Sequence, residues 1–167
     1  NSISSEIIFK SWQKRNVFRH KPFFIIGNVN LLNLQKKKLK YKIKIKQIND
    51  ELNLKYLKSN EMPVYNVKYN QKNAFSKITK KSNSYILKCF DKAIDFKKNK
   101  KIIGFINCPV SKETLFKKKH QGITEFLSKK SGIMGNEAML IYNKQLSVSP
   151  ITTHISLKKV SQEIKTK

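Results

Sequence analysis

The sequence has few of the residues that build disulfide frameworks and metal knuckles, and it lacks long apolar runs. Only two of the 167 residues are cysteines, Cys89 and Cys108, and they are too scattered for a disulfide framework or a zinc knuckle. No apolar run approaches the roughly 20 residues that a membrane-spanning helix requires; the longest, PFFIIG, covers residues 22–27. We therefore expect a soluble globular protein of the reducing cytoplasm, without a membrane partner.

Arginine and acidic residues are also scarce. Ten acidic residues stand against 36 basic ones, which gives a formal net charge of +26, and only Arg15 and Arg19 are arginines. Such a charge makes nucleic acid the first partner to consider. However, arginine is the residue that best forms bidentate hydrogen bonds with phosphates and bases, and this chain has little of it. The lysines are spread along the whole chain, without zinc-finger spacing or an RNA-binding signature. A solvated lysine-rich surface is favoured, a nucleic-acid-binding module stays the alternative, and the positive field favours anionic metabolites.

The first half of the chain alternates between helical and extended patterns. Its apolar residues recur at helical spacing, form a short continuous run, or alternate strictly with lysines, and each pattern is typical of one kind of element. They predict a helix at residues 4–14 capped by Ser4 or Ser5, a buried strand at 22–28, a helix at 29–37, a strand at 39–48, and a loop or short edge strand around Pro63 at 59–69.

The second half predicts the element on which the fold class depends. Residues 74–100 carry one apolar stripe opposite lysines, which predicts the longest helix. The stripe consists of Phe75, Ile78, Ile86, Cys89, Phe90, Ala93 and Ile94. The run KIIGFINCPV at residues 101–110 then predicts a central strand. A strand, a helix and a second strand in this order indicate a right-handed crossover, a parallel sheet and the α/β class.

Candidate functional residues follow that predicted central strand, because ligands of parallel sheets gather beyond the carboxyl ends of the strands. Ser111 is placed to cap a helix, and Lys112 offers a flexible cation, although most lysines are merely solvated. Thr124 is placed to cap a helix that ends at Gly132, which is a structural role. His154 follows a predicted hairpin at residues 137–154, and from spacing alone a packing role outweighs metal binding, since no second ligand is in view.

Three ordered motifs carry a resemblance to a known family. CPVSK at residues 108–112, GITEFL at 122–127 and AMLIYNKQLSVSPITTHISL at 138–157 together resemble the 4-hydroxythreonine-4-phosphate dehydrogenase family of vitamin B6 biosynthesis. The opening NSISSEII resembles the end of that family's N-terminal glycine-rich motif. The resemblance covers the whole chain, weakly at residues 31–70 and well at 104–157.

The resemblance implies a fold, an activity and a set of roles. It implies the two-domain α/β/α sandwich of the isocitrate and isopropylmalate dehydrogenases, and a homodimer with a shared active site. The implied reaction uses NAD, or NADP, to oxidise 4-phosphohydroxy-L-threonine, and the 3-oxo acid then loses carbon dioxide. A divalent metal, Zn, Mg or Co, held by three histidines acts as the Lewis acid. His154 matches the first metal ligand, Lys112 the catalytic lysine, and Thr124 with Ile123 the substrate-contacting pair.

Two departures qualify what the resemblance implies. Ile123 stands where the family has histidine, so a substrate hydrogen bond is lost and a different phosphorylated hydroxy acid becomes an alternative substrate. The chain also opens inside the family's first motif and stops soon after His154. We therefore expect residues 1–167 to be the N-terminal part of a two-domain dehydrogenase, lacking the extreme N-terminus and the C-terminal half. Alone, it is expected to bind neither metal nor NAD tightly and to be inactive.

Overall fold

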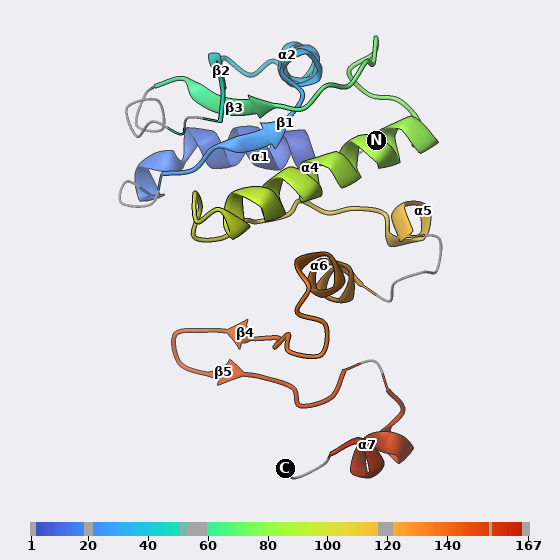
Figure 1. Ribbon diagram of the computed structural model, residues 1–167. Coiled ribbons are helices and arrows are strands. Elements are labelled where there is room, and N and C mark those ends of the chain that lie inside the picture. Colours follow the sequence, from blue (N-terminus) through green and yellow to red (C-terminus); the bar gives the residue numbers. More distant parts are fainter. Residues whose placement is uncertain are drawn as a thin grey trace. The chain divides into compact units, whose positions relative to one another are not determined.

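The computed structural model of the protein describes residues 3–18, 22–50, 52, 60–116, 122–153 and 155–164. The chain divides into two compact units, Asn1–Leu115 and Phe116–Lys167, and each is described by itself. The first unit contains the parallel sheet, and the second contains helices and a short hairpin (Figure 1). The sheet therefore belongs entirely to the first unit.

The first unit contains a three-stranded parallel sheet in the order β1-β3-β2. Its strands are β1 (Ile25–Gly27), β2 (Ile45–Ile48) and β3 (Met62–Asn66). Its helices are α1 (Ser4–Gln13), the 3-10 turn η1 (Arg15–Phe18), α2 (Val29–Lys38) and α4 (Lys80–Lys98), and α5 (Lys112–Phe116) ends at the boundary between the units. The α/β class with a parallel sheet is therefore confirmed.

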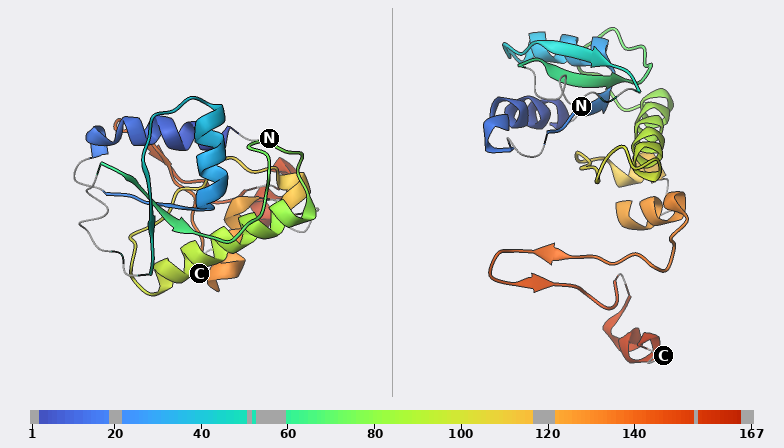
Figure 2. Two further views of the ribbon diagram at one scale, coloured as in Figure 1. Left: turned by 90° about the horizontal axis from the view of Figure 1, so that it is seen from above. Right: turned by 60° about the vertical axis from the view of Figure 1, so that its left-hand side comes forward.

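The central strand β3 sends its side chains alternately to the two faces of the sheet, as extended backbone does. Met62 and Val64, both fully buried, join a core built with Phe9 and Trp12 of α1 and Leu32 of α2. On the other face, the ring of Tyr65 meets Phe96 of α4 edge to face, with the ring centroids 5.1 Å apart. Helices thus cover both faces, with α4 on the opposite side of the strands from α1 (Figure 2).

Helix α4 starts later than the apolar stripe predicts. Thr79 forms a capping box, in which its hydroxyl accepts from the Ser82 N–H at 3.1 Å and the Ser82 hydroxyl accepts from the Thr79 N–H at 2.8 Å. Phe75 and Ile78 therefore precede the helix, and Ile78 is 46% exposed. Within the described part of the chain, no helix is long and apolar enough to cross a bilayer.

The two helices of the other face begin differently. Helix α2 is capped as its sequence allows, because the side chain of Asn28 accepts a hydrogen bond from the Leu31 N–H. Helix α1 has Ile3 at its cap position and no side-chain cap, so the prediction that Ser4 or Ser5 caps it is wrong. Ser5 instead lies buried inside the helix, where it faces the body of the unit.

The segment around Pro63 is not a loop or an edge strand but the buried centre of the sheet. Along β3 and the residue after it, the N–H groups point alternately toward the two neighbouring strands: that of Met62 bonds the Lys44 carbonyl just before β2, and that of Val67 bonds the Gly27 carbonyl at the end of β1. By this alternation, an N–H at position 63 would point toward β1. It would face residue 23, which is two residues before β1 begins at Ile25. A proline is tolerated here because its missing donor falls outside the β1 ladder.

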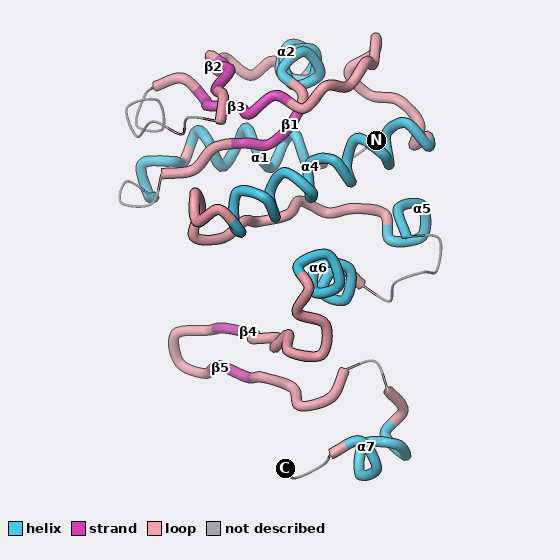
Figure 3. The backbone as a smooth tube through the Cα atoms, viewed as in Figure 1, coloured by secondary structure: helices cyan, strands magenta, loops and turns pink. Residues whose placement is uncertain are grey.

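Two expected strands also differ from the structure. The extended segment predicted at residues 39–48 pairs only from Ile45, although Ile43 before it is already buried. Residues 101–110, expected to be a central strand, are coil in the described structure (Figure 3). Ile103 and Ile106 there are 92% and 98% exposed, and among the described residues no strand pairs with this segment. An apolar pattern alone does not make a strand without a neighbour to pair with.

The second unit consists of helix α6 (Ile123–Ser131), the antiparallel pair β4 (Ile141–Tyr142) and β5 (Ser147–Val148), and helix α7 (Leu157–Glu163). Gly132 ends α6 in the left-handed conformation, with φ of 75°, as predicted. The hairpin through residues 143–146 also confirms the prediction. Ser156 occupies the cap position of α7, but its side chain makes no capping bond.

Candidate functional site

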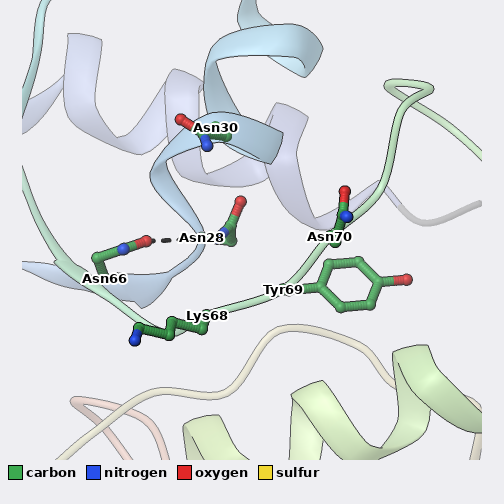
Figure 4. Close-up of a pocket in the computed structure, with 6 residues that line it drawn as sticks. All are labelled: Asn28, Asn30, Asn66, Lys68, Tyr69 and Asn70. Atoms are coloured by element: carbon green, nitrogen blue, oxygen red, sulfur yellow. Dashed lines mark hydrogen bonds between the residues drawn. The ribbon is translucent and has the colours of Figure 1, made fainter.

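A polar hollow of about 370 Å³ lies at the carboxyl ends of β1 and β3. Its lining residues come from the start of α2 and from the segment that follows β3. They are Asn28, Asn30, Asn66, Lys68, Tyr69 and Asn70 (Figure 4). The parallel sheet places a site where ligands of such sheets commonly bind, but at strands other than the one predicted from the sequence.

The floor of the hollow is held by two asparagines. The Asn28 side chain is 4% exposed; its Oδ1 accepts from the Leu31 N–H at 2.9 Å, and its Nδ2 donates to the Val67 carbonyl at 3.0 Å. The Asn66 Oδ1 accepts from the Asn28 Nδ2 at 3.4 Å and from the Val29 N–H at 3.0 Å. These bonds join the end of β3 to the first turn of α2 and fix both amides in place.

One side of the hollow is supported by a pair of stacked tyrosines. Tyr69 stacks on Tyr85 of α4 with the ring centroids 4.6 Å apart, and the Tyr85 hydroxyl accepts from the Asn28 N–H at 2.8 Å. A Cβ at Gly27 would stand 3.3 Å from that hydroxyl, so glycine permits its close approach. Burial raises the pKa of Tyr85 well above its usual range and that of Cys89 to about 12. Both groups stay neutral at physiological pH.

Sequence reasoning missed every residue of this hollow. The visible signal was Asn28 directly after a buried strand, where it caps a helix. The second half of the lining begins 38 residues later at Asn66, within the segment at residues 59–69 that was expected to be a loop or edge strand. Only the pairing of β1 with β3 brings the two halves together.

Lys112 is the first residue of α5 in the first unit, and it is exposed. The helix begins as expected after Ser111, whose carbonyl accepts from the Leu115 N–H at 3.0 Å and from the Thr114 hydroxyl at 3.2 Å. The side chain of Asn83 in α4 donates to the Thr114 carbonyl at 2.7 Å. Lys112 therefore stands on a turn that is tied to α4, with its ammonium group in solvent.

Ile123 and Thr124 lie at the start of α6 in the second unit. Gly122 occupies the cap position, so Thr124 is the second residue of the helix and the prediction that it caps the helix is wrong. Both side chains are half-buried. The helix is anchored by Phe126, which is 4% exposed and packs on Phe116 with the ring centroids 5.0 Å apart. The predicted lysine and the predicted substrate pair thus belong to different units.

His154, the predicted metal ligand, lies outside the described residues, as do His20 and His120. Among the described residues there is no group of three or more His, Cys, Asp or Glu side chains that could hold a metal ion. The described residues alone therefore do not fit a metal centre. The role of His154 stays a prediction.

The family of the pyridoxal phosphate biosynthetic protein PdxA matches residues 19–167, which is most of the chain. The chain belongs to this family. Among curated proteins, none matches the sequence significantly. The expected resemblance to the dehydrogenase of vitamin B6 biosynthesis is thereby confirmed at the level of the PdxA family.

A solved PdxA-type structure shows the same fold. The crystal structure of a 4-hydroxythreonine-4-phosphate dehydrogenase from Burkholderia phymatum matches with a TM-score of 0.84 and 21% sequence identity. The match covers 98% of this chain and 50% of that chain. The present PdxA-family chain therefore spans half the length of the dehydrogenase it resembles, and the fold expected from the resemblance is confirmed over that half.

Proposed function

We propose that this chain is the N-terminal part of a dehydrogenase that oxidises and decarboxylates 4-phosphohydroxy-L-threonine to 3-amino-2-oxopropyl phosphate, with NAD or NADP as the oxidant. Membership of the PdxA family over residues 19–167 is the observation that carries the proposal. The net charge of +26 agrees with it, since a positive field attracts a phosphorylated substrate. The proposal includes a cytoplasmic location, where this enzyme would take part in cofactor synthesis.

The residues of this chain have distinct proposed roles. The exposed ammonium group of Lys112, raised on the first turn of α5, contacts the anionic substrate as the catalytic lysine. The hydroxyl of Thr124 donates to a substrate oxygen from the start of α6, and Ile123 beside it covers the apolar part of the substrate. His154 supplies one nitrogen ligand to a divalent metal, Zn, Mg or Co.

The complete site needs residues from beyond this chain. Because one histidine does not make a metal centre, the other ligands and most of the nucleotide site are proposed to come from the rest of a full-length protein. A divalent metal held in part by His154 would supply Lewis acidity, and a nicotinamide cofactor would supply the oxidant. The homodimer with a shared active site is part of the same proposal.

Ile123 favours a second candidate within the same reaction class. An isoleucine offers no hydrogen bond where the resembling family has a histidine, and it is half-buried at the start of α6. A substrate with one polar group fewer at this point, such as another phosphorylated hydroxy acid, would leave no donor or acceptor unpaired. A lysine-rich nucleic-acid-binding module, in contrast, has only the net charge in its favour.

The test is NADH formation by a full-length protein that contains this chain, with 4-phosphohydroxy-L-threonine and a divalent metal. We expect turnover that His154→Ala abolishes and that the matched variant His20→Ala retains. Lys112→Gln is expected to lower kcat/KM by at least about a hundredfold, the effect of losing a charged contact in a transition state. Lys98→Gln, which removes an exposed lysine at the end of α4, serves as its charge-matched control.

Each outcome of this experiment has a definite meaning. Equal activity in His154→Ala and in the natural protein would refute the metal-ligand role. No turnover of 4-phosphohydroxy-L-threonine by a folded, metal-binding protein, with turnover of another phosphorylated hydroxy acid, would select the second candidate, and Ile123→His should then restore the first substrate. Nucleic-acid binding that persists at physiological salt, without any dehydrogenase activity, would favour the nucleic-acid-binding module.

A further inference from the structure

The polar hollow lies at a topological switch point of the sheet. From the end of β1 the chain enters α2, whose Leu32 packs on the same face as Met62 and Val64 of β3. From the end of β3 the chain leads to α4, whose Phe96 packs on the opposite face against Tyr65. Two adjacent parallel strands whose connections leave on opposite faces open a crevice between them, and such crevices bind ligands.

The walls of the crevice offer donors and a cation. Within the part of the chain that the structure describes, the side chains of Asn30, Lys68 and Asn70 form no hydrogen bond or ion pair. All three line the hollow and are exposed to solvent. Asn66 uses its Oδ1 for the floor, which directs its Nδ2 amide toward other acceptors. None of the described residues that line the hollow is a carboxylate. This composition disfavours a metal cation and favours an oxyanion.

The site does not depend on the N-terminus of α2. The N–H groups of Val29 and Leu31 in the first turn are already bonded to the side chains of Asn66 and Asn28. An anion in the hollow would therefore be held chiefly by side chains, namely the Lys68 ammonium and the amides of Asn30 and Asn70. In Figure 4, Asn66 points toward Asn28, and the Asn70 amide lies above the ring of Tyr69.

We propose that this hollow binds a phosphorylated small molecule. Several donors and one cation match a dianion with three terminal oxygens better than a flat carboxylate with two. The volume of about 370 Å³ exceeds that of a phosphate group and leaves room for an organic portion beside Tyr69. None of the six lining residues has a role in the proposed dehydrogenase reaction, so this proposal does not rest on that function.

The test is an NMR titration of the 15N-labelled 167-residue chain with inorganic phosphate, at constant ionic strength and pH, with acetate as the carboxylate arm. We expect saturable shifts of the amides of Asn30, Asn66 and Lys68 with phosphate and none with acetate. Lys68→Gln should weaken phosphate binding roughly tenfold, the effect expected for a charge-assisted hydrogen bond. Lys72→Gln, which removes the same charge outside the hollow, should leave the affinity unchanged within about twofold.

A second variant separates binding from folding. Asn30→Asp places a negative charge in the first turn of α2, where a carboxylate stabilises a helix, so the variant is expected to fold while its charge repels phosphate. Asn73→Asp is the matched control outside the hollow. If Lys68→Gln and Lys72→Gln weaken binding equally, the attraction is that of a polycation in general and the proposal is wrong. Equal binding of acetate and phosphate would also overturn it.

Discussion

Removing the ring of Phe96 should detach α4 from the sheet. Phe96 is 1% exposed, and its ring meets Phe24 and Tyr65 edge to face with centroids 5.6 and 5.1 Å apart. The Lys92 Nζ lies 4.7 Å from the ring centroid, and Lys92 also pairs with Asp50 at 2.7 Å. A buried Phe→Ala change costs about 3–5 kcal/mol, which includes the cavity left behind. Because small domains are stable by only about 5–15 kcal/mol, Phe96→Ala should remove a large part of the stability.

The assay for this prediction uses the fluorescence of Trp12 during urea unfolding. Trp12 is the sole tryptophan and is 3% exposed in the core of the first unit, so its signal reports that unit alone. The control is Ile106→Ala, since Ile106 is 98% exposed and its truncation should change the free energy of unfolding by less than about 0.5 kcal/mol. A loss below about 1 kcal/mol for Phe96→Ala, or equal losses for the two variants, would refute the packing described for α4.

Two further predictions concern titratable groups. The hydrogen bond from Lys92 holds the pKa of Asp50 below its usual range, so this carboxylate stabilises the fold above its unfolded pKa of about 3.9 and loses that effect as the pH falls through its lower folded value. Asp50→Asn should therefore lower the urea midpoint at pH 7 and leave it unchanged near pH 2; a deficit that persists at pH 2 would contradict the assignment. Burial raises the pKa of Cys89 to about 12, so iodoacetamide at pH 8 should alkylate this thiol only as the first unit unfolds, and rapid labelling of Cys89 in the folded chain, seen by mass spectrometry, would show the burial to be wrong.

The sequence was sufficient where a local signal and the tertiary structure agree. The apolar run ending at Gly27 and the helical spacing that follows Asn28 predict a strand and a helix, and both are present. Gly132 ends α6 because the left-handed conformation suits glycine. The apolar spacing predicts a helix from residue 74, but the capping box of Thr79 and Ser82 starts α4 at Lys80.

The sequence was insufficient where partners distant along the chain decide the outcome. Proline argued against a central strand at Pro63, yet the position of its missing donor is set by the register with β1. Ile103 and Ile106 have the composition of a strand but no paired neighbour in the described residues. The hollow was likewise hidden, because the strand order that joins Asn28 to Asn66 cannot be read from either segment alone.

Pro63 also helps to fix the register of β1 against β3. If β1 shifted by two residues toward the start of β3, each side chain would still point to the same face of the sheet. Packing of the core alone would therefore not exclude this wrong register. The carbonyl of Ile25 would then meet the nitrogen of Pro63, which has no hydrogen to give. A buried acceptor left without a donor costs about 1–3 kcal/mol. Pro63, which made this strand hard to predict, thus favours the register that places Asn28 and Asn66 side by side at the strand ends.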